Sequence, residues 1–374
     1  MSRAAPFSFY EFFAGGGMAR LGLGDAWTCL FANDFDPLKA RTYRENFPDA
    51  QAHLHEGDVW AVEPAALTGR ADLAWASSPC QDFSLAGGRA GLKGGKSSAF
   101  FGFWNLMEAL DAEDRAPRVL VIENVSGLLT SNDGRDFAAL CDVLVKRGYR
   151  VGALEVDAAA FTPQSRPRIF VIAARHVLPH LIGASPFQTE AVRLAHDRLP
   201  KSLQEAWAWW SVPAAPARNA DLASILEPDD AVAWREEAVT AALLDMMAPL
   251  HRARVETARA SGARAVGAVF RRMRGGVQRA EVRFDGLAGC LRTPRGGSSR
   301  QTVIVVDKGQ VRSRLITARE AARLMGLPED YRLPKSQSGG LHVMGDGVAV
   351  PVVRWLAEHL LEPLAARPTA VAAE

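Results

Sequence analysis

Short apolar segments alternate with helix-type segments along the first 175 residues, and this alternation is the feature that most limits how the chain can fold. The apolar segments are typical of strands at residues 7–13, 27–32, 72–76, 119–125, 150–157 and 168–174. The intervening segments are typical of helices at residues 20–26, 37–46, 99–109 and 137–147, and Asp36 followed by Pro37 marks the start of the second helix. Strand–helix–strand alternation predicts an α/β fold with a mainly parallel sheet.

The alternation stops after Arg175, where a stretch without clear period leads into an arginine-rich segment and a strand-like run at residues 301–306. Helical patterns return at residues 317–325 and 351–361. A chain of 374 residues also exceeds what one hydrophobic core usually organises. We therefore predict an α/β domain at residues 1–175, a smaller domain at 176–313, and a segment at 314–374 that returns to the first domain.

Two predicted strands deliver reactive side chains to the same edge of the sheet. Residues 73–84, LAWASSPCQDFS, carry a strand into the Pro79–Cys80 turn, and residues 119–125, VLVIENV, end on Glu123 and Asn124. In open α/β sheets, ligands bind beyond the carboxyl ends of the strands. A lone cysteine beside an apolar strand is more often a small buried hydrophobe than a nucleophile, so Cys80 alone decides nothing.

Cysteine usage and charge narrow the class of protein further. Four cysteines without CxxC or Cys/His pairing argue against zinc and a disulfide framework, and they suit a reducing cytosol. The sequence has neither a signal-peptide pattern nor a membrane-span pattern, so we expect no membrane association. The net charge is only +2, yet residues 251–300 hold twelve arginines and three acidic residues. This segment suits either a phosphate backbone or a solvated helix face.

The glycine-rich segment after the first strand suggests a cofactor with an adenosine moiety. Residues 13–17, FAGGG, would let backbone amides approach a ligand, but position 20 is Arg20, where a dinucleotide fingerprint needs glycine. A cofactor without phosphates fits better. At the end of the next strand, Asp34 is placed to bind ribose hydroxyls and Phe35 to cover an adenine face. Asp58 is either an acceptor for the adenine amino group or a helix or turn cap.

These segments together resemble a known family. FFAGGG, ANDFD, GDV, SSPCQDFS, IENV, PQSRPRIFVIAA, TAREAARLMGLP and GDGV occur in the order and approximate spacing of the cytosine-5 DNA methyltransferases. The likeness spans nearly the whole chain, and PCQxFS, ENV and QxRxR in series are its most specific parts. It implies a Rossmann-like S-adenosylmethionine domain and a smaller DNA target-recognition domain at residues 176–313.

The resemblance also implies roles for individual residues. The catalytic set is Cys80, Glu123, Asn124, Arg166 and Arg168. The cofactor-binding set is Phe13, Ala14, Gly15, Gly17, Asp34, Phe35, Asp58, Val59, Pro79 and Val348. The resemblance adds Gln81, Ser84 and Gln164 as DNA-binding residues, and charge adds Arg271, Arg272, Arg292 and Arg295.

Within the catalytic set, the resemblance makes Cys80 the nucleophile that adds to C6 of cytosine and so activates C5. Glu123 would bind and protonate the ring at N3, and Arg168 would neutralise charge on the ring. Burial favours the neutral acid at Glu123 while Arg168 favours the carboxylate, and the sequence leaves that balance open. Because C6 is inaccessible in a stacked duplex, the base must be flipped out.

Two motifs depart from the family pattern, the first and the last. The usual Asp-Leu of the first motif is Glu11-Phe12, and the second glycine of the usual pair is Met18, which predicts a less permissive loop. The last motif reads Gly345-Asp346-Gly347-Val348 in place of Gly-Asn-Ser-Val. This change either weakens cofactor binding or is neutral, with Asp346 capping the final helix, and the second interpretation is favoured.

We expect a DNA cytosine-C5 methyltransferase that uses S-adenosylmethionine on double-stranded DNA in the bacterial cytosol and works as a monomer. It would act beside a cognate restriction endonuclease, or as an orphan or phage-borne enzyme. A tRNA cytosine methyltransferase and a catalytically silent DNA-binding homologue are the alternatives. The long segment at residues 176–313 favours DNA, and the intact Cys80, Glu123 and Arg168 set disfavours the silent homologue.

Overall fold

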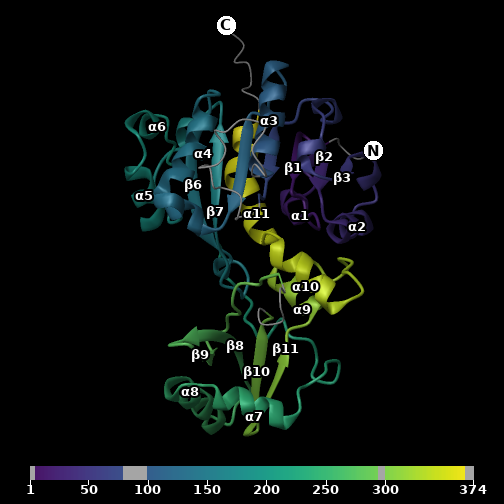
Figure 1. Ribbon diagram of the computed structural model, residues 1–374, viewed down its shortest axis with the longest axis vertical. Helices are drawn as coiled ribbons and strands as arrows, with labels where there is room; N and C mark the ends of the chain where they lie inside the picture. Colours follow the sequence, from purple (N-terminus) through teal and green to yellow (C-terminus); the bar gives the residue numbers. More distant parts are fainter. Residues whose placement is uncertain (1–4, 79–98, 294–299, 367–374) are drawn as a thin grey trace. The chain divides into compact units, whose positions relative to one another are not determined.

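The computed structural model describes residues 5–78, 99–293 and 300–366, and the chain divides into two compact units (Figure 1). Unit 1 comprises Met1–Val156, Pro167–Ala215 and Val352–Glu374, and unit 2 comprises Asp157–Arg166 and Pro216–Pro351. Unit 1 therefore extends to residue 215, beyond the predicted boundary at 175. The tryptophans explain the difference, because the Trp210 Nε1–H donates to the Ile172 carbonyl at 3.1 Å and Trp207 forms a bridge with Val151.

Unit 1 is built on a seven-stranded sheet in the order β3-β2-β1-β4-β5-β7-β6. Its strands are β1 (Phe7–Phe12), β2 (Trp27–Asp34), β3 (Leu54–Glu56), β4 (Leu73–Ala76), β5 (Val119–Asn124), β6 (Arg150–Asp157) and β7 (Pro167–Ala174). The pairs β1–β2, β2–β3, β1–β4 and β4–β5 are parallel, whereas β7 runs antiparallel to β5. The prediction of a mainly parallel sheet in an α/β fold is confirmed.

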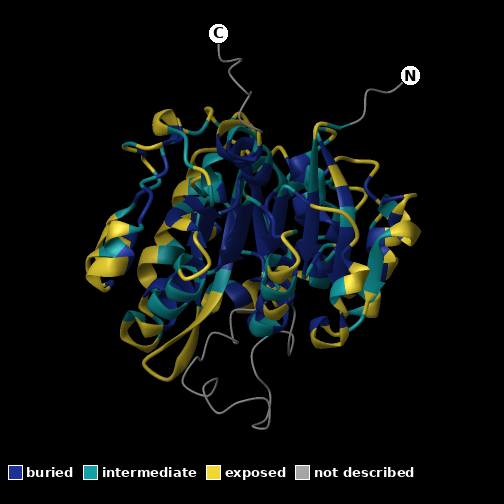
Figure 2. Ribbon diagram, turned by 90° about the horizontal axis from the view of Figure 1, so that it is seen from above, coloured by how far each residue is buried: buried dark blue, intermediate teal, exposed yellow. Residues whose placement is uncertain are grey.

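Helices cover this sheet, whose strands are the dark-blue buried centre of Figure 2. They are α1 (Met18–Leu23), α2 (Pro37–Asn46), α3 (Ala99–Ala112), α4 (Arg135–Val145), α5 (Glu190–Asp197), α6 (Lys201–Glu205) and, at the C-terminus, α11 (Val350–Leu356) and α12 (Glu362–Ala365). The predicted start of α2 is confirmed, since the Asp36 side chain accepts from the amides of Leu38 and Lys39. Within the described residues, no helix is both long and apolar enough to cross a membrane.

Unit 2 contains a four-stranded antiparallel sheet in the order β11-β10-β8-β9. Its strands are β8 (Ala265–Arg274), β9 (Val277–Arg283), β10 (Thr302–Asp307) and β11 (Gln310–Leu315), and its helices are α7 (Glu237–Asp245), α8 (Pro249–Ala260), α9 (Ala318–Leu324) and α10 (Gln337–Asp346). Leu243 and Met247 near the end of α7 and Val255 of α8 pack against Val269 and Ile304 of the sheet. One face of the sheet is thus covered by α7 and α8.

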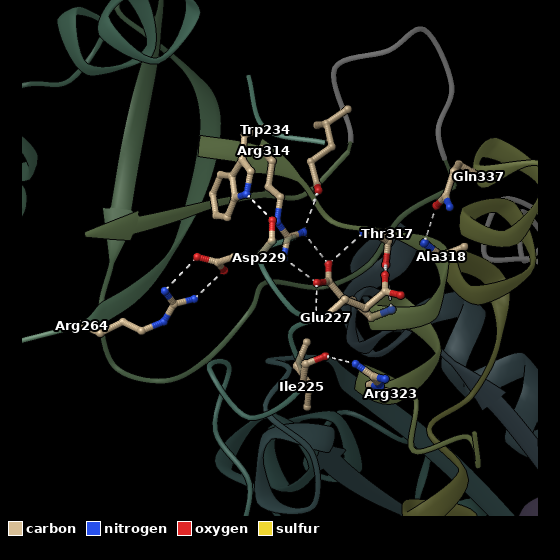
Figure 3. A network of polar contacts seen from close by, with 12 residues as sticks. Ile225, Glu227, Asp229, Trp234, Arg264, Arg314, Thr317, Ala318, Arg323 and Gln337 are labelled. Carbon is tan, nitrogen blue, oxygen red and sulfur yellow. Dashed lines mark hydrogen bonds and ion pairs between the residues drawn. The ribbon is translucent and has the colours of Figure 1, made fainter. Parts of the chain in front are cut away.

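Of the segment predicted to return to unit 1, residues 314–351 belong to unit 2 and only residues 352–374 to unit 1. A buried polar network joins the start of this segment to the sheet of unit 2 (Figure 3). Arg314 at the end of β11 makes two hydrogen bonds to the Glu320 carboxylate on α9, at 2.8 and 2.6 Å, and both side chains are fully buried. Glu320 also accepts from the Thr317 amide and completes a capping box at the start of α9. The sheet and α9 are therefore joined by a desolvated ion pair.

Candidate active site

The carboxyl ends of four neighbouring strands of unit 1 meet at one edge of the sheet. Phe12 at the end of β1 pairs with Asn33 of β2 and with Ala76 of β4, and Ala76 pairs in turn with Ile122 of β5. Residues at these strand ends or directly after them are therefore neighbours: the glycine loop at residues 13–17, Asp34, Ser77–Ser78, and Glu123. This is the edge at which open α/β sheets bind ligands.

The glycine loop adopts an uncommon backbone conformation. Phe13, Gly15 and Gly17 have φ values of 58°, 57° and 80°. A Cβ at Gly17 would lie 2.2 Å from the Phe47 ring, so a side chain does not fit there. Met18 is the first residue of α1 and is buried, so the missing second glycine costs the loop no left-handed position. The prediction of a less permissive loop is therefore wrong for the backbone.

Asp34 is a buried carboxylate that holds the glycine loop. One of its oxygens accepts from the Gly15 amide at 2.8 Å and the other from the Asp36 amide at 2.9 Å. Burial raises the pKa of Asp34, while Lys39 and the two amides oppose that effect. A Cβ added at Gly15 would meet no atom within 4 Å, so the loop borders open space at this point. Asp34 thus orders the backbone beside a space that a ligand could enter.

The two other predicted adenosine contacts differ in how they are engaged. The Phe35 ring is 69% exposed and is available for stacking. Asp58 caps a short helix, Val59–Ala61, by accepting from the Trp60 amide at 3.0 Å, so the capping alternative is confirmed for this side chain. Val59 is buried against α3, where a Cβ at Gly102 would lie 2.7 Å from its Cγ1 atom.

Glu11 introduces a second buried carboxyl next to the loop, on β1. It is 1% exposed, and burial raises its pKa to about 8, although the Arg20 guanidinium works in the opposite direction. The signal in the sequence is an acidic residue inside the apolar strand FSFYEF. We infer that Glu11 is neutral in the folded protein near pH 7.

Glu123 and Arg168 form an ion pair at the carboxyl end of β5. The Arg168 Nε atom lies 3.1 Å from a Glu123 carboxylate oxygen, and the side chains are only 15% and 8% exposed. Asn124 extends the arrangement, because its Nδ2 donates to the Ser78 carbonyl at 2.9 Å and its Oδ1 accepts from the Val125 amide. Since Ser78 directly precedes Pro79, Asn124 anchors the chain at the start of the Pro79–Cys80 segment. Pro79, Cys80, Gln81, Ser84 and Arg295 themselves lie outside the described residues.

Arg166 and Gln164 are engaged inside unit 2, which differs from the roles expected for them. Arg166 is 2% exposed and donates to the carbonyls of Leu291, Gly345 and Gly347 at 2.9, 2.9 and 2.6 Å. Gln164 is fully buried; its amide nitrogen donates to the Leu324 carbonyl and its oxygen accepts from the Leu291 amide, both at 3.0 Å. Both side chains hold main-chain atoms together, so Gln164 presents no surface to DNA.

The last predicted motif lies at the end of α10. Gly345 packs so closely on residues 292–293 that a Cβ would lie 2.5 Å from the Thr293 nitrogen. Asp346 is the last residue of α10 and accepts a hydrogen bond from the Thr293 hydroxyl. Because α11 begins at Val350, the expectation that Asp346 caps the final helix is wrong. Val348 is buried in unit 2.

The arginine-rich segment is divided between helix α8 and the β8–β9 hairpin. Arg271 and Arg272 lie on β8 and are exposed, as is Arg292 in the loop after β9. Arg272 lies 3.4 Å from Glu281, and Arg274 lies 2.7 Å from the same carboxylate. Arg271, Arg272 and Arg274 thus lie at the end of the β8–β9 hairpin. The alternative of a solvated helix face applies to Arg252, Arg254 and Arg259 on α8.

Comparison with known proteins is consistent with this geometry. A family model described as C-5 cytosine-specific DNA methylase matches residues 7–362. The Type II methyltransferase M.BsuFI of Bacillus subtilis is 26% identical over 97% of this chain and 74% of its own length, and M.NlaX of Neisseria lactamica is 27% identical over 96% and 98%. The crystal structure of S. pombe Dnmt2 methyltransferase superposes with a TM-score of 0.60 at 17% identity, covering 96% of this chain and 99% of that one. At that identity, the structural likeness concerns the fold.

Proposed function

The chain belongs to the C-5 cytosine-specific DNA methylase family, and we propose that it methylates C5 of a flipped-out cytosine in a short duplex site through a covalent bond between Cys80 and C6. The observation that carries the proposal is the Glu123–Arg168 pair beside Asn124, at the carboxyl edge of the sheet. Asn124 fixes Ser78, which precedes Cys80 by two residues in the sequence, and the strands β4 and β5 are neighbours in the sheet.

The chemistry assigns separate tasks to these residues. Addition of the Cys80 thiolate to C6 makes C5 nucleophilic, and negative charge develops on the ring toward N3 and O2. When the base is bound, Glu123 takes up a proton from solvent and donates it toward N3, and the Arg168 cation, which pairs with the Glu123 carboxylate in the free protein, then stabilises the charge on the ring. After methyl transfer, a base takes the C5 proton, and the electrons of that C–H bond form the C5–C6 double bond as the Cys80 thiolate leaves C6.

S-adenosylmethionine fits the first unit as the methyl donor, and when bound it supplies an electrophilic methyl group on a sulfonium centre. Support comes from the open space beside Gly15, the exposed Phe35 ring and the Asp34 carboxylate that faces the loop. Position 20 is Arg20, where the dinucleotide-binding fingerprint has its third glycine, and this agrees with a ligand that lacks a pyrophosphate. The proposed cofactor contacts in unit 1 further include Ala14, Val59 and Pro79. Asp58 keeps its capping role, and Val348, which lies in unit 2, stays a prediction from the sequence.

Unit 2 is the proposed target-recognition part, and its cations are the proposed contacts to the DNA backbone. Arg271, Arg272 and Arg292 are exposed there, and each phosphate that an arginine neutralises makes binding more salt-dependent. Gln81, Ser84 and Arg295 are proposed as further contacts from the sequence. The relatives named above are Type II methyltransferases, which supports a role beside a restriction endonuclease. We propose that the enzyme acts as a monomer, since it modifies one base at a time.

The test is incubation of the full chain with tritiated S-adenosylmethionine and either plasmid DNA or tRNA. We expect label in DNA only, at C5 of cytosine. Label only in tRNA would show that the substrate is RNA and not DNA. Label in neither would support a catalytically silent DNA-binding protein.

The covalent step is tested with Cys80→Ser and with duplex containing 5-fluorocytosine, which traps the adduct because fluorine does not leave as the C5 proton does. Cys141→Ser is the matched control, because Cys141 is buried in α4. We expect turnover and adduct to vanish for Cys80→Ser and to persist for Cys141→Ser. Substantial methylation by Cys80→Ser would contradict the covalent route.

A further inference from the structure

The end of the β8–β9 hairpin is exposed on both of its faces. Residues 271–279 are all exposed, whereas Ala280, paired with Arg271, is fully buried. Gly275 and Gly276, with φ values of 55° and 78°, connect Arg274 to Val277 in a two-residue turn. Strands that pack on a core bury at least one face, so this part of the hairpin forms a two-stranded ribbon that is free of the sheet's core.

The ribbon tip combines cationic side chains with apolar side chains whose exposure to water is unfavourable. Met273 and Val277 are 63% and 51% exposed. Residues 271–279 contain four arginines and no acidic residue. Such a surface fits a polyanion that also offers apolar contacts, which describes the base edges and phosphates of a nucleic acid.

The strand register sorts these side chains onto two faces. Arg272 pairs with Arg279, and Phe270 pairs with Glu281, so these four share one face; there the Glu281 carboxylate already engages Arg272 and Arg274. Met273 pairs with Gln278 on the opposite face, together with Arg271. Among the described residues, Arg271 makes no ion pair. The second face therefore carries a cation, an amide and a thioether that are uncommitted within unit 2.

A second guanidinium lies beside Arg271. Arg235 donates from Nη2 to the Thr302 hydroxyl at 3.4 Å, and Thr302 pairs with Val269 two residues before Arg271 on the same face. Partial burial and the neighbouring Arg271 charge lower the pKa of Arg235. The Arg235 Nη1 atom is buried without a hydrogen-bond partner among the described residues. Two like charges and an unused donor make a site that an anion would stabilise.

We propose that the ribbon tip enters the major groove of the target DNA, where Met273 and Gln278 contact base edges and Arg235 with Arg271 holds a flanking phosphate. This inference rests on the proposed function and names the residues that select its site. Three residue steps from Arg271 to Arg274 reach roughly 10 Å at a rise of about 3.3 Å each. The major groove is about 12 Å wide and 8.5 Å deep and admits a two-stranded ribbon.

The side chains suit the two kinds of contact. A glutamine amide can bond an adenine edge with a donor and an acceptor at once, and a thioether side chain can pack on a thymine methyl group. The paired guanidiniums of Arg235 and Arg271 suit a phosphate, which carries no sequence information. Met273 and Gln278 are therefore specificity determinants, and the two arginines contribute affinity.

The experiment compares the full-length wild type with the double variant Met273→Ala/Gln278→Ala and with Arg271→Gln. Each protein is given a library of duplexes with randomised sequence; bound fragments are sequenced, and methylated cytosines are mapped by bisulfite conversion. Lys308→Gln is the matched control, because Lys308 is exposed in the β10–β11 turn, outside the ribbon. Thermal unfolding confirms that each variant is folded.

For the double variant, we expect discrimination at one or two base positions to fall about tenfold or more, with the salt dependence of binding unchanged. For Arg271→Gln, we expect the same site, weaker binding, and a slope of log affinity against log salt reduced by about 0.9. Lys308→Gln should match the wild type. Unchanged site and affinity in both ribbon variants would overturn the inference, as would equal effects from Lys308→Gln.

Failure of the inference can be told apart from failure of the proposed function. If the wild type methylates cytosine while the ribbon variants behave as wild type, only the ribbon assignment fails. If the wild type methylates no DNA but the ribbon variants change which fragments are bound, the assignment holds and the catalytic proposal fails.

Discussion

Replacing Glu11 by glutamine should change how the stability of the protein depends on pH. The Glu11 carboxyl is buried in β1 beside the glycine loop, and its pKa is about 8 in the folded chain against an ordinary value of 4.5. Between these two values the folded protein holds a proton that the unfolded chain has released. Stability from this group is therefore complete below about pH 4.5 and is lost as the pH rises toward 8.

The size of the effect follows from linkage. Each pH unit in that window removes about 1.4 kcal/mol, so at pH 7 the wild type has lost about 3 kcal/mol relative to pH 4.5 through this one group. Glutamine has nearly the same shape and does not titrate. The advantage of Glu11→Gln over the wild type in unfolding free energy should therefore grow by about 3 kcal/mol from pH 4.5 to pH 7.

Urea unfolding at several pH values between 4.5 and 8.5, followed by tryptophan fluorescence, measures this difference. Glu45→Gln provides the control, because Glu45 is exposed on α2. The reasoning is refuted if the difference between Glu11→Gln and the wild type does not change with pH. That result would mean that Arg20 keeps the carboxyl ionised in the folded protein.

Three further perturbations test other parts of the structure. Glu320→Gln leaves the buried Arg314 without its carboxylate partner and should lower the unfolding free energy by about 3–5 kcal/mol, measurable by urea unfolding; a loss below about 1 kcal/mol would show that the pair is not desolvated. Gly17→Ala places a Cβ 2.2 Å from Phe47 and should cost about 1–3 kcal/mol in the same assay and weaken S-adenosylmethionine binding by calorimetry, whereas wild-type values for both would refute the close approach. Asn124→Ala frees the buried Ser78 carbonyl and should lower kcat by roughly 10- to 100-fold in the methylation assay, together with a loss of about 1–3 kcal/mol in unfolding free energy; an unchanged kcat would remove Asn124 from the positioning of Cys80.

Most of unit 1 could be predicted because its strands are buried on both faces and its helices carry clear start signals. Helix α2 matches the predicted residues 37–46, and β6 matches the predicted residues 150–157. The antiparallel direction of β7 was not predicted, since strand direction depends on how the chain returns after β6 and leaves no mark in the strand's own residues.

Unit 2 was predicted less well, for a physical reason. Residues 271–279 are exposed on both faces, so they lack the alternation of apolar and polar residues that marks a half-buried strand. In the candidate site, the positions of Glu123 and Asn124 could be predicted, because both residues lie at the carboxyl end of a strand. The sequence did not reveal that Arg166 and Gln164 bind main-chain atoms, because a polar side chain in a motif carries no sign of its partners.

The contacts of Arg166 and Gln164 bear on how such an enzyme can diversify. Unit 2 is assembled from two separated stretches of chain, and the short one supplies these two anchoring side chains. Both side chains hydrogen-bond main-chain atoms, which nearly every residue type provides. These atoms are four carbonyl oxygens and one amide nitrogen, at Leu291, Leu324, Gly345 and Gly347. A new DNA-contacting surface could thus replace parts of residues 216–351 without any change at Arg166 or Gln164, provided that the backbone path at those four residues is kept.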